Sequence, residues 1–276
     1  MFAQVFFIVW RESLEALLVV GVLHSWLARN SSNYGELRYL WGGVAAGLVA
    51  AVALSAVFDR LNAILPPEGQ DLFQMAIILI AAGLIVHMVF WMRKHGQNLK
   101  QQLEAGLSSA TSNNHYWGIF ILAFVAVMRE GSETAVFVQG ILSSGGSENS
   151  SAFYGIALAI LTAAASYIPL QLGMRFLSWR MFFRITESML LLLACALIVS
   201  GAEHLISLGV LPYTDPLWNT AFLLDDMSRF GGVIANLTGY RAMPDMATVA
   251  VWFLYWGTLV FAAKRHKTRQ LSAHPV

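Results

Sequence analysis

The sequence predicts an all-α integral membrane protein with seven transmembrane helices. Of its 276 residues, 57% are hydrophobic and only 12% are charged, whereas a soluble domain usually carries about 25% charged residues. Mean hydropathy is +0.61, and apolar stretches of about 20 residues, long enough to cross a bilayer, recur along the chain. The formal net charge is +1 and no basic run is interleaved with aromatic residues, so we expect the lipid bilayer as a partner and no nucleic acid.

The seven predicted helices follow one another through short polar connections. We expect them at about 2–28, 38–58, 72–92, 116–141, 152–174, 183–208 and 246–263. The first stretch lacks a basic start and continues past Arg11, so we interpret it as a retained helix and not as a signal peptide. Segment 210–245 is too polar to span and too apolar for a simple loop, which favours an outer interfacial or partly re-entrant helix. Residues 264–276 form the predicted cytoplasmic tail.

The positive charges predict the orientation of the chain. They cluster in the connections after the first, third and fifth helices and in the tail: Arg29, Arg38, Arg93, Lys94, Lys100, Arg175, Arg180, Arg184, Lys264, Arg265, Lys267 and Arg269. The opposite connections carry mainly aspartate and glutamate. Because positive residues stay on the cytoplasmic side, we expect the N-terminus outside and the C-terminus inside.

This orientation predicts two inverted three-helix repeats. The first helix would run inward and the fourth outward, so repeat one covers about 1–92 and repeat two about 116–209, with the seventh helix added at 246–263. Inverted repeats with a binding site near the bilayer midplane are typical of transporters.

Two short strings place charges in the middle of predicted membrane helices. Both have the pattern R-E-x-x-E, from Arg11 to Glu15 and, 118 residues later, from Arg129 to Glu133. Each charge costs about 2.5–3.5 kcal/mol at a membrane helix centre on insertion scales, which makes such residues functional candidates. Residues three and four apart share a helix face, so each string presents two carboxylates and one guanidinium together.

The two strings together predict a cation site. If their helices face each other, the charges that converge are those of Glu12, Glu15, Glu130 and Glu133, with Arg11 and Arg129 behind them. Four negative and two positive charges leave a net charge of minus two, which a multivalent cation would relieve. Carboxylate oxygens are hard ligands that suit iron or manganese. Interhelical ion pairing without a ligand is the alternative, but it does not account for a surplus carboxylate in both strings.

The duplicated string resembles the hallmark of the oxidase-dependent iron transporter family, which includes the fungal high-affinity iron permease. Further stretches resemble its bacterial branch, the EfeU-type ferrous iron permeases: Met88 to Lys94, Asp226-Met227-Ser228, Gly239-Tyr240 and Val249 to Phe253. The resemblance covers essentially the whole chain. The spacer Gly131-Ser132 differs from the leucine-containing spacer of the first string, but it is not a ligand position.

The resemblance implies a permease, not an enzyme, that imports iron across the bacterial inner membrane. It implies that Glu12, Glu15, Glu130 and Glu133 bind iron and that Arg11 and Arg129 balance their charge. It also implies delivery as Fe(II), with possible coupled oxidation to Fe(III). The sequence contains no redox motif, so a periplasmic partner of the cupredoxin-like or haem-peroxidase type would handle the oxidation, and no permanent cofactor is expected.

Two alternatives and one secondary site remain open. The same carboxylates could carry another divalent cation such as Mn(II), or support proton-coupled exchange. A membrane-embedded carboxylate enzyme is a weaker alternative, because di-iron bundles use Glu-x-x-His pairs and neither string contains histidine. Asp225 and Asp226 lie in the outer segment, where they either capture the ion before it reaches the midplane or cap local structure.

Overall fold

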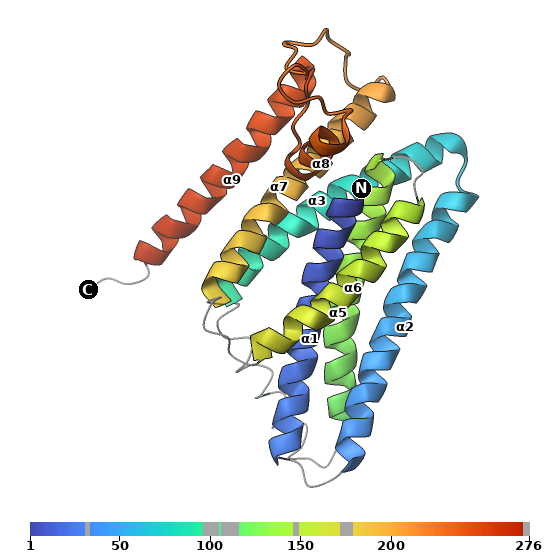
Figure 1. The fold of residues 1–276 in the computed structure, drawn as a ribbon, viewed down its shortest axis with the longest axis vertical. Coiled ribbons are helices and arrows are strands. Elements are labelled where there is room, and N and C mark those ends of the chain that lie inside the picture. Colours follow the sequence, from blue (N-terminus) through green and yellow to red (C-terminus); the bar gives the residue numbers. More distant parts are fainter. Residues whose placement is uncertain (31–33, 96–104, 106–115, 146–148, 172–178, 273–276) are drawn as a thin grey trace. The chain divides into compact units, whose positions relative to one another are not determined.

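The computed structural model describes residues 1–30, 34–95, 105, 116–145, 149–171 and 179–272. The described residues are mostly helical and contain no strand (Figure 1). In chain order the helices are α1 (Phe2–Asn30), α2 (Tyr34–Ile64), α3 (Pro67–His95), α5 (Tyr116–Gly145), α6 (Asn149–Gln171), α7 (Trp179–Ser207), α8 (Arg229–Thr238) and α9 (Met246–Ser272). Most extend past the predicted apolar stretches, because a helix continues into the polar residues that flank its membrane-spanning part.

Three helical segments in the described part of the chain are long and apolar enough to cross a membrane: Gly35–Ile64, Pro67–Arg93 and Arg184–Ser207. The apolar segments Ser151–Tyr167 and Met246–Ala262 are shorter. Helices α1 and α5 each carry one arginine and two glutamates within five residues, which lowers their apolar character. The number of seven spans and the orientation therefore remain predictions. Of the positive residues behind the orientation, Lys100 and Arg175 lie outside the described residues.

The chain packs as two units, and the first covers residues 1–191. Helix α5 has the central place in this unit, since it contacts α1, α2 and α3, while α1 also contacts α6. Figure 1 shows α1 descending from the N-terminus beside α5, which runs in the opposite direction.

Small residues let α2 approach α5 closely. Gly43 and Gly47 lie over Ala123 and Val127 of α5, respectively, and a methyl group on Gly43 would stand 2.4 Å from the carbonyl oxygen of Phe120. One turn further, Ala51 fills the position opposite Gly131, whose own Cβ would lie 2.4 Å from that of Ala51. The residue numbers increase in the same direction along both sides of this contact, so α2 and α5 run parallel. Such small-residue contacts are a common means of packing helices in membranes, where the hydrophobic effect does not drive helix association.

The contact between α1 and α6 follows the same pattern. Gly155 lies against Phe2 and Val5, and more than two turns further along both helices Leu14 packs against the fully buried Ala163. These helices are also parallel. The two R-E-x-x-E strings are 118 residues apart, and Val5 and Ala123 are separated by the same number of residues. The contact of Gly155 with Val5 between α6 and α1 therefore corresponds to the contact of Gly43 with Ala123 between α2 and α5.

The second unit covers residues 192–276 and contains α8, α9 and the larger part of α7. The predicted outer segment 210–245 contains α8 as its helix. Ser228 caps the N-terminus of α8, where its hydroxyl accepts the amide of Gly231 at 3.0 Å. Gly239 ends the helix with φ of 75°, a conformation that favours glycine, and its Cα lies so close to α7 that a Cβ would stand 3.2 Å from the Cα of Ala196.

Candidate metal centre

The two strings lie in the middle of α1 and α5, two helices that contact each other within the first unit. One hydroxyl within the second string and one directly after it bond to the helix backbone: Ser132 Oγ donates to the carbonyl of Arg129 and Thr134 Oγ1 to that of Glu130, both at 2.8 Å. These hydroxyls are thereby satisfied locally and leave the glutamates free to face α1.

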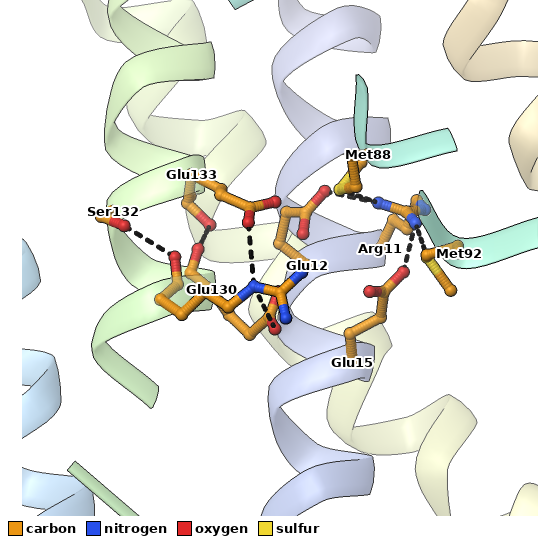
Figure 2. Close-up of polar contacts among 10 residues, drawn as sticks. Arg11, Glu12, Glu15, Met88, Met92, Glu130, Ser132 and Glu133 are labelled. Atoms are coloured by element: carbon orange, nitrogen blue, oxygen red, sulfur yellow. Dashed lines mark hydrogen bonds and ion pairs between the residues drawn. The ribbon is translucent and has the colours of Figure 1, made fainter. Parts of the chain in front are cut away.

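Three of the four predicted ligands converge. One carboxylate oxygen from each of Glu12, Glu130 and Glu133 lies within 4.8 Å of the other two. The group combines one residue of α1 with two of α5 (Figure 2). Metal–oxygen bonds of about 2.0–2.2 Å place the oxygens around one ion up to about 4 Å apart, so small side-chain rotations would close this group around a cation.

Arg11 is buried and holds both glutamates of its own string. Its side chain is 1% exposed, its Nη1 lies 2.7 Å from Oε1 of Glu12, and its Nη2 forms an ion pair with Glu15. Nη1 also donates to the sulfur of Met88 at 3.2 Å, and Nη2 to that of Met92 at 2.8 Å. Glu15 therefore turns toward Arg11 and lies outside the group of three (Figure 2).

Arg129 has a more open environment, although its string has the same letters. Its side chain is 41% exposed, and its Nε lies 3.2 Å from Glu133 and 3.9 Å from Glu130. The guanidinium carbon stands 4.2 Å above the centre of the Trp91 ring, a cation–π distance. The two arginines thus balance charge in different ways, one enclosed and one at the edge of the site.

The group of carboxylates is under-satisfied. Oε2 of Glu12 and Oε2 of Glu133 are buried and have no hydrogen-bond partner among the described residues. Across the six charges of the two strings, two guanidiniums face four carboxylates, a net charge of minus two if all are ionised. A buried oxygen without a partner is costly. An arrangement of this kind is able to bind a cation, which would supply both the charge and the missing partner.

Helix α3 contributes three side chains that the motifs alone do not reveal. Met88, Trp91 and Met92 contact the two arginines. In the sequence, only the resemblance of the stretch Met88 to Lys94 to the family pointed to these residues. The pattern M-x-x-W-M puts all three on neighbouring positions of one helix face, but nothing in it identifies an arginine as the group they face.

A further buried carboxylate, Glu187 of α7, lies in the first unit. Oε2 of Glu187 accepts from Nε of Arg93 at 2.8 Å. The side chain of Arg93 is about half exposed, so it extends its charge toward the end of α3. This ion pair connects α7 to α3, and Glu187 is not part of the group formed by Glu12, Glu130 and Glu133.

Asp225 and Asp226 lie in the second unit and both bond to the backbone. Oδ1 of Asp225 accepts the amide of Met227 at 2.9 Å, and Oδ2 of Asp226 accepts that of Ala242 at 3.2 Å. These bonds give each aspartate a structural role in the outer segment. Whether they also capture an ion stays a prediction.

A partly buried arginine, Arg241, lies in the same outer segment. Burial lowers the pKa of the Arg241 guanidinium, but Glu203 and Asp226 together raise it by more, so the pKa lies above its usual value and the arginine stays charged. Nη2 of Arg241 donates to Oε2 of Glu203 at 2.7 Å. Glu203 is therefore engaged in an ion pair within this unit.

Known proteins match this chain over most of its length. The iron permease FTR1 family matches residues 1–266. The ferrous iron permease EfeU of Escherichia coli O6:H1 is 30% identical over 258 residues, covering 91% of each chain. That of Yersinia pestis is 29% identical over 265 residues, covering 91% of this chain and 89% of the other. No solved structure matches the chain.

Proposed function

Because the chain belongs to the iron permease FTR1 family, we propose that it imports iron through a buried carboxylate site made by its two R-E-x-x-E strings. Family membership and the apolar helices make it a multi-pass membrane protein and a transporter, not an enzyme. The bacterial relatives carry the name ferrous iron permease, which supports Fe(II) as the delivered ion and the inner membrane as the location.

The convergence of Glu12, Glu130 and Glu133 carries the proposal. The three oxygens come from two helices and from both strings, lie within 4.8 Å of one another, and belong to side chains that are largely buried. Glu15, one turn further along α1, would be the fourth ligand and would take the ion from Glu12 on the way to the cytoplasm. Arg11 and Arg129 limit the repulsion among the carboxylates while the site is empty.

The packing of the first unit supports the inverted repeats. A two-fold relation that exchanges α1 with α5 also exchanges α2 with α6, and it requires the α2–α5 contact to recur as an α6–α1 contact. Both contacts occur, and both bring a glycine onto a small or branched residue of the helix that carries the string: Gly43 on Ala123, and Gly155 on Val5. A site at such an axis can open to either side by rocking of the repeats.

The delivery of iron would need other proteins. We propose a periplasmic iron-binding or oxidase partner, of the cupredoxin-like or haem-peroxidase type, that presents iron on the side of the outer segment. Asp225 and Asp226 would be the first carboxylates to capture the ion there. Oxidation to Fe(III), if it accompanies transfer, would take place on that partner.

Removal of single carboxylates tests the site. We expect Glu12→Gln and Glu133→Gln to lower uptake of radioactive iron at limiting concentration by about 100-fold or more, since loss of even an outer partner of a metal ligand costs 10–100-fold. Glu68→Gln removes an exposed carboxylate at the start of α3 and serves as the matched control. Normal uptake by both site variants, at equal protein in the membrane, would refute the proposal.

Competition distinguishes iron from manganese, because hard carboxylate ligands suit both ions. We expect Fe(II) to displace Mn(II) from the purified protein in nanodiscs under anaerobic conditions, and excess Mn(II) to inhibit iron uptake only weakly. Preferential transport of Mn(II) would assign the same site to the other ion.

A further inference from the structure

One segment of α3, from Met88 to Met92, contacts the arginines of both strings. Met88 and Met92 accept hydrogen bonds from Arg11 of α1, and Trp91 lies under Arg129 of α5. Figure 2 shows both methionine side chains beside the Arg11 guanidinium, to which their sulfurs are joined by hydrogen bonds. A single helical turn is therefore the shared contact of the two charge-balancing residues.

Two of the contacts of the Arg11 guanidinium are with sulfur atoms and not with carboxylate oxygens. A guanidinium has five N–H donors, and at 1% exposure Arg11 has almost no access to solvent. It directs one bond each to Met88 and Met92, and one ion pair each to Glu12 and Glu15. Thioether sulfur is a weak, neutral acceptor. The two sulfurs therefore pair with Nη1 and Nη2 without adding negative charge and without competing for a cation, while the buried Nε of Arg11 has no hydrogen-bond partner among the described residues.

The Trp91 ring has the corresponding effect on Arg129. The ring face attracts the guanidinium electrostatically but presents no lone pair. Arg129 then approaches Glu133 through Nε at 3.2 Å and remains 3.9 Å from Glu130. If Arg129 lost this support, its charged group could turn fully onto the two carboxylates and occupy the oxygens that face Glu12.

We propose that Met88, Trp91 and Met92 are positioning residues that keep the two arginines from neutralising the ion site, so that Glu12, Glu130 and Glu133 retain oxygens for the ion. This inference rests on the proposed function, because it concerns the affinity of the same site. The three side chains act through the arginines and do not bind the ion themselves.

Leucine and glutamine at the methionine positions separate this role from simple packing. Leucine keeps the volume and apolar character of methionine but accepts no hydrogen bond, whereas glutamine keeps a neutral acceptor at similar length. If the sulfurs act as acceptors, Met88→Leu and Met92→Leu weaken binding of Fe(II) about tenfold, the size expected for one lost hydrogen-bond partner. Met88→Gln and Met92→Gln stay close to the unmodified protein. A packing role predicts the opposite order, since buried glutamine is then harmful and leucine harmless.

The measurement is the dissociation constant of Fe(II) for the full chain in nanodiscs under anaerobic conditions, together with KM and kcat of iron uptake. We expect KM to rise with little change in kcat. Met75→Leu, on the same helix but about four turns away, is the matched control and should bind normally. For the aromatic position we expect Trp91→Phe to retain most of the affinity and Trp91→Leu to lose it roughly fivefold.

The outcomes distinguish this inference from the proposed function. If Glu12→Gln binds Fe(II) normally, the proposed function fails. If Glu12→Gln loses binding while the leucine variants bind normally, or bind better than the glutamine variants, only the positioning role fails. The positioning role is also supported if the leucine variant fails to accumulate in the membrane while the glutamine variant accumulates normally. A role in packing alone predicts that the glutamine variant is the one that fails to accumulate.

Discussion

The two arginines show that identical motif letters do not give identical environments. Arg11 has four acceptors within a closed pocket, two carboxylates and two sulfurs, whereas Arg129 is 41% exposed and lies on an aromatic ring. A planar guanidinium can address several acceptors in fixed directions, and a lysine ammonium cannot reproduce that fork. The cost of replacing each arginine should therefore differ.

We expect Arg11→Lys to lower iron uptake at limiting concentration by at least about tenfold, because the shorter ammonium loses several of the four contacts in a buried site. Arg129→Lys should cost only about two- to threefold, since a half-exposed ammonium is solvated and can still lie over Trp91. The measurement is uptake by each variant, normalised to the amount of protein in the membrane. Equal losses in the two variants would contradict the environments described above.

At the level of single residues, the sequence identified the six charges but not their pairing. The spacing of Glu12 and Glu15 indicates one helix face, yet only packing shows that Glu12 joins the second string while Glu15 stays with Arg11. The methionines were unpredictable for the same reason, since a contact between α1 and α3 joins residues 77 and 81 positions apart.

At the level of elements, the contact between α2 and α5 fixes how the second string faces the first. Gly43, Gly47 and Ala51 form its α2 side, and Gly131, a spacer residue of the string, lies against Ala51. The spacer is therefore a packing position: the residue there sets the distance between the helices and does not bind the ion.

Gly43 and its neighbour Gly42 provide a matched test of this contact. A methyl group on Gly43 would lie 2.4 Å from the Phe120 carbonyl oxygen, whereas one on Gly42 would be no closer than 3.6 Å to its nearest neighbour. We expect Gly43→Ala to destabilise the protein by about 1–3 kcal/mol, as overpacking usually does. Gly42→Ala should be neutral or slightly stabilising, because alanine has the higher helix propensity.

Thermal unfolding of both glycine variants in the same detergent checks this expectation. Both variants gain the same helix propensity, so the difference between their stabilities reports the effect of the added methyl group on the α2–α5 packing. If Gly43→Ala were as stable as Gly42→Ala, the close α2–α5 contact would be wrong.

At the level of the whole molecule, the orientation in the membrane decides which way iron moves. The positive residues predict that the start of α3 is outside and the end of α9 is in the cytoplasm. The fully buried Cys195 is the one cysteine of the chain, so Cys195→Ala gives a background for single-cysteine labelling.

On that background we expect Glu68→Cys to react with a membrane-impermeant maleimide in intact spheroplasts, and Gln270→Cys to react only after permeabilisation. The physical reason is that positively charged connections are retained on the cytoplasmic side. Labelling in the reverse order would invert the orientation and exchange the two sides of the site.

By itself, the sequence determined the helical class, the approximate positions of the helices and the two charged strings, because hydrophobic length and charge in an apolar segment are local properties. It also indicated the duplication, through the repeated R-E-x-x-E pattern. Tertiary structure alone decided that Glu12 lies with Glu130 and Glu133, that Arg11 is enclosed while Arg129 is open, and that α3 supports both. These features depend on contacts between helices far apart in the chain, which close packing of side chains selects and no local pattern encodes.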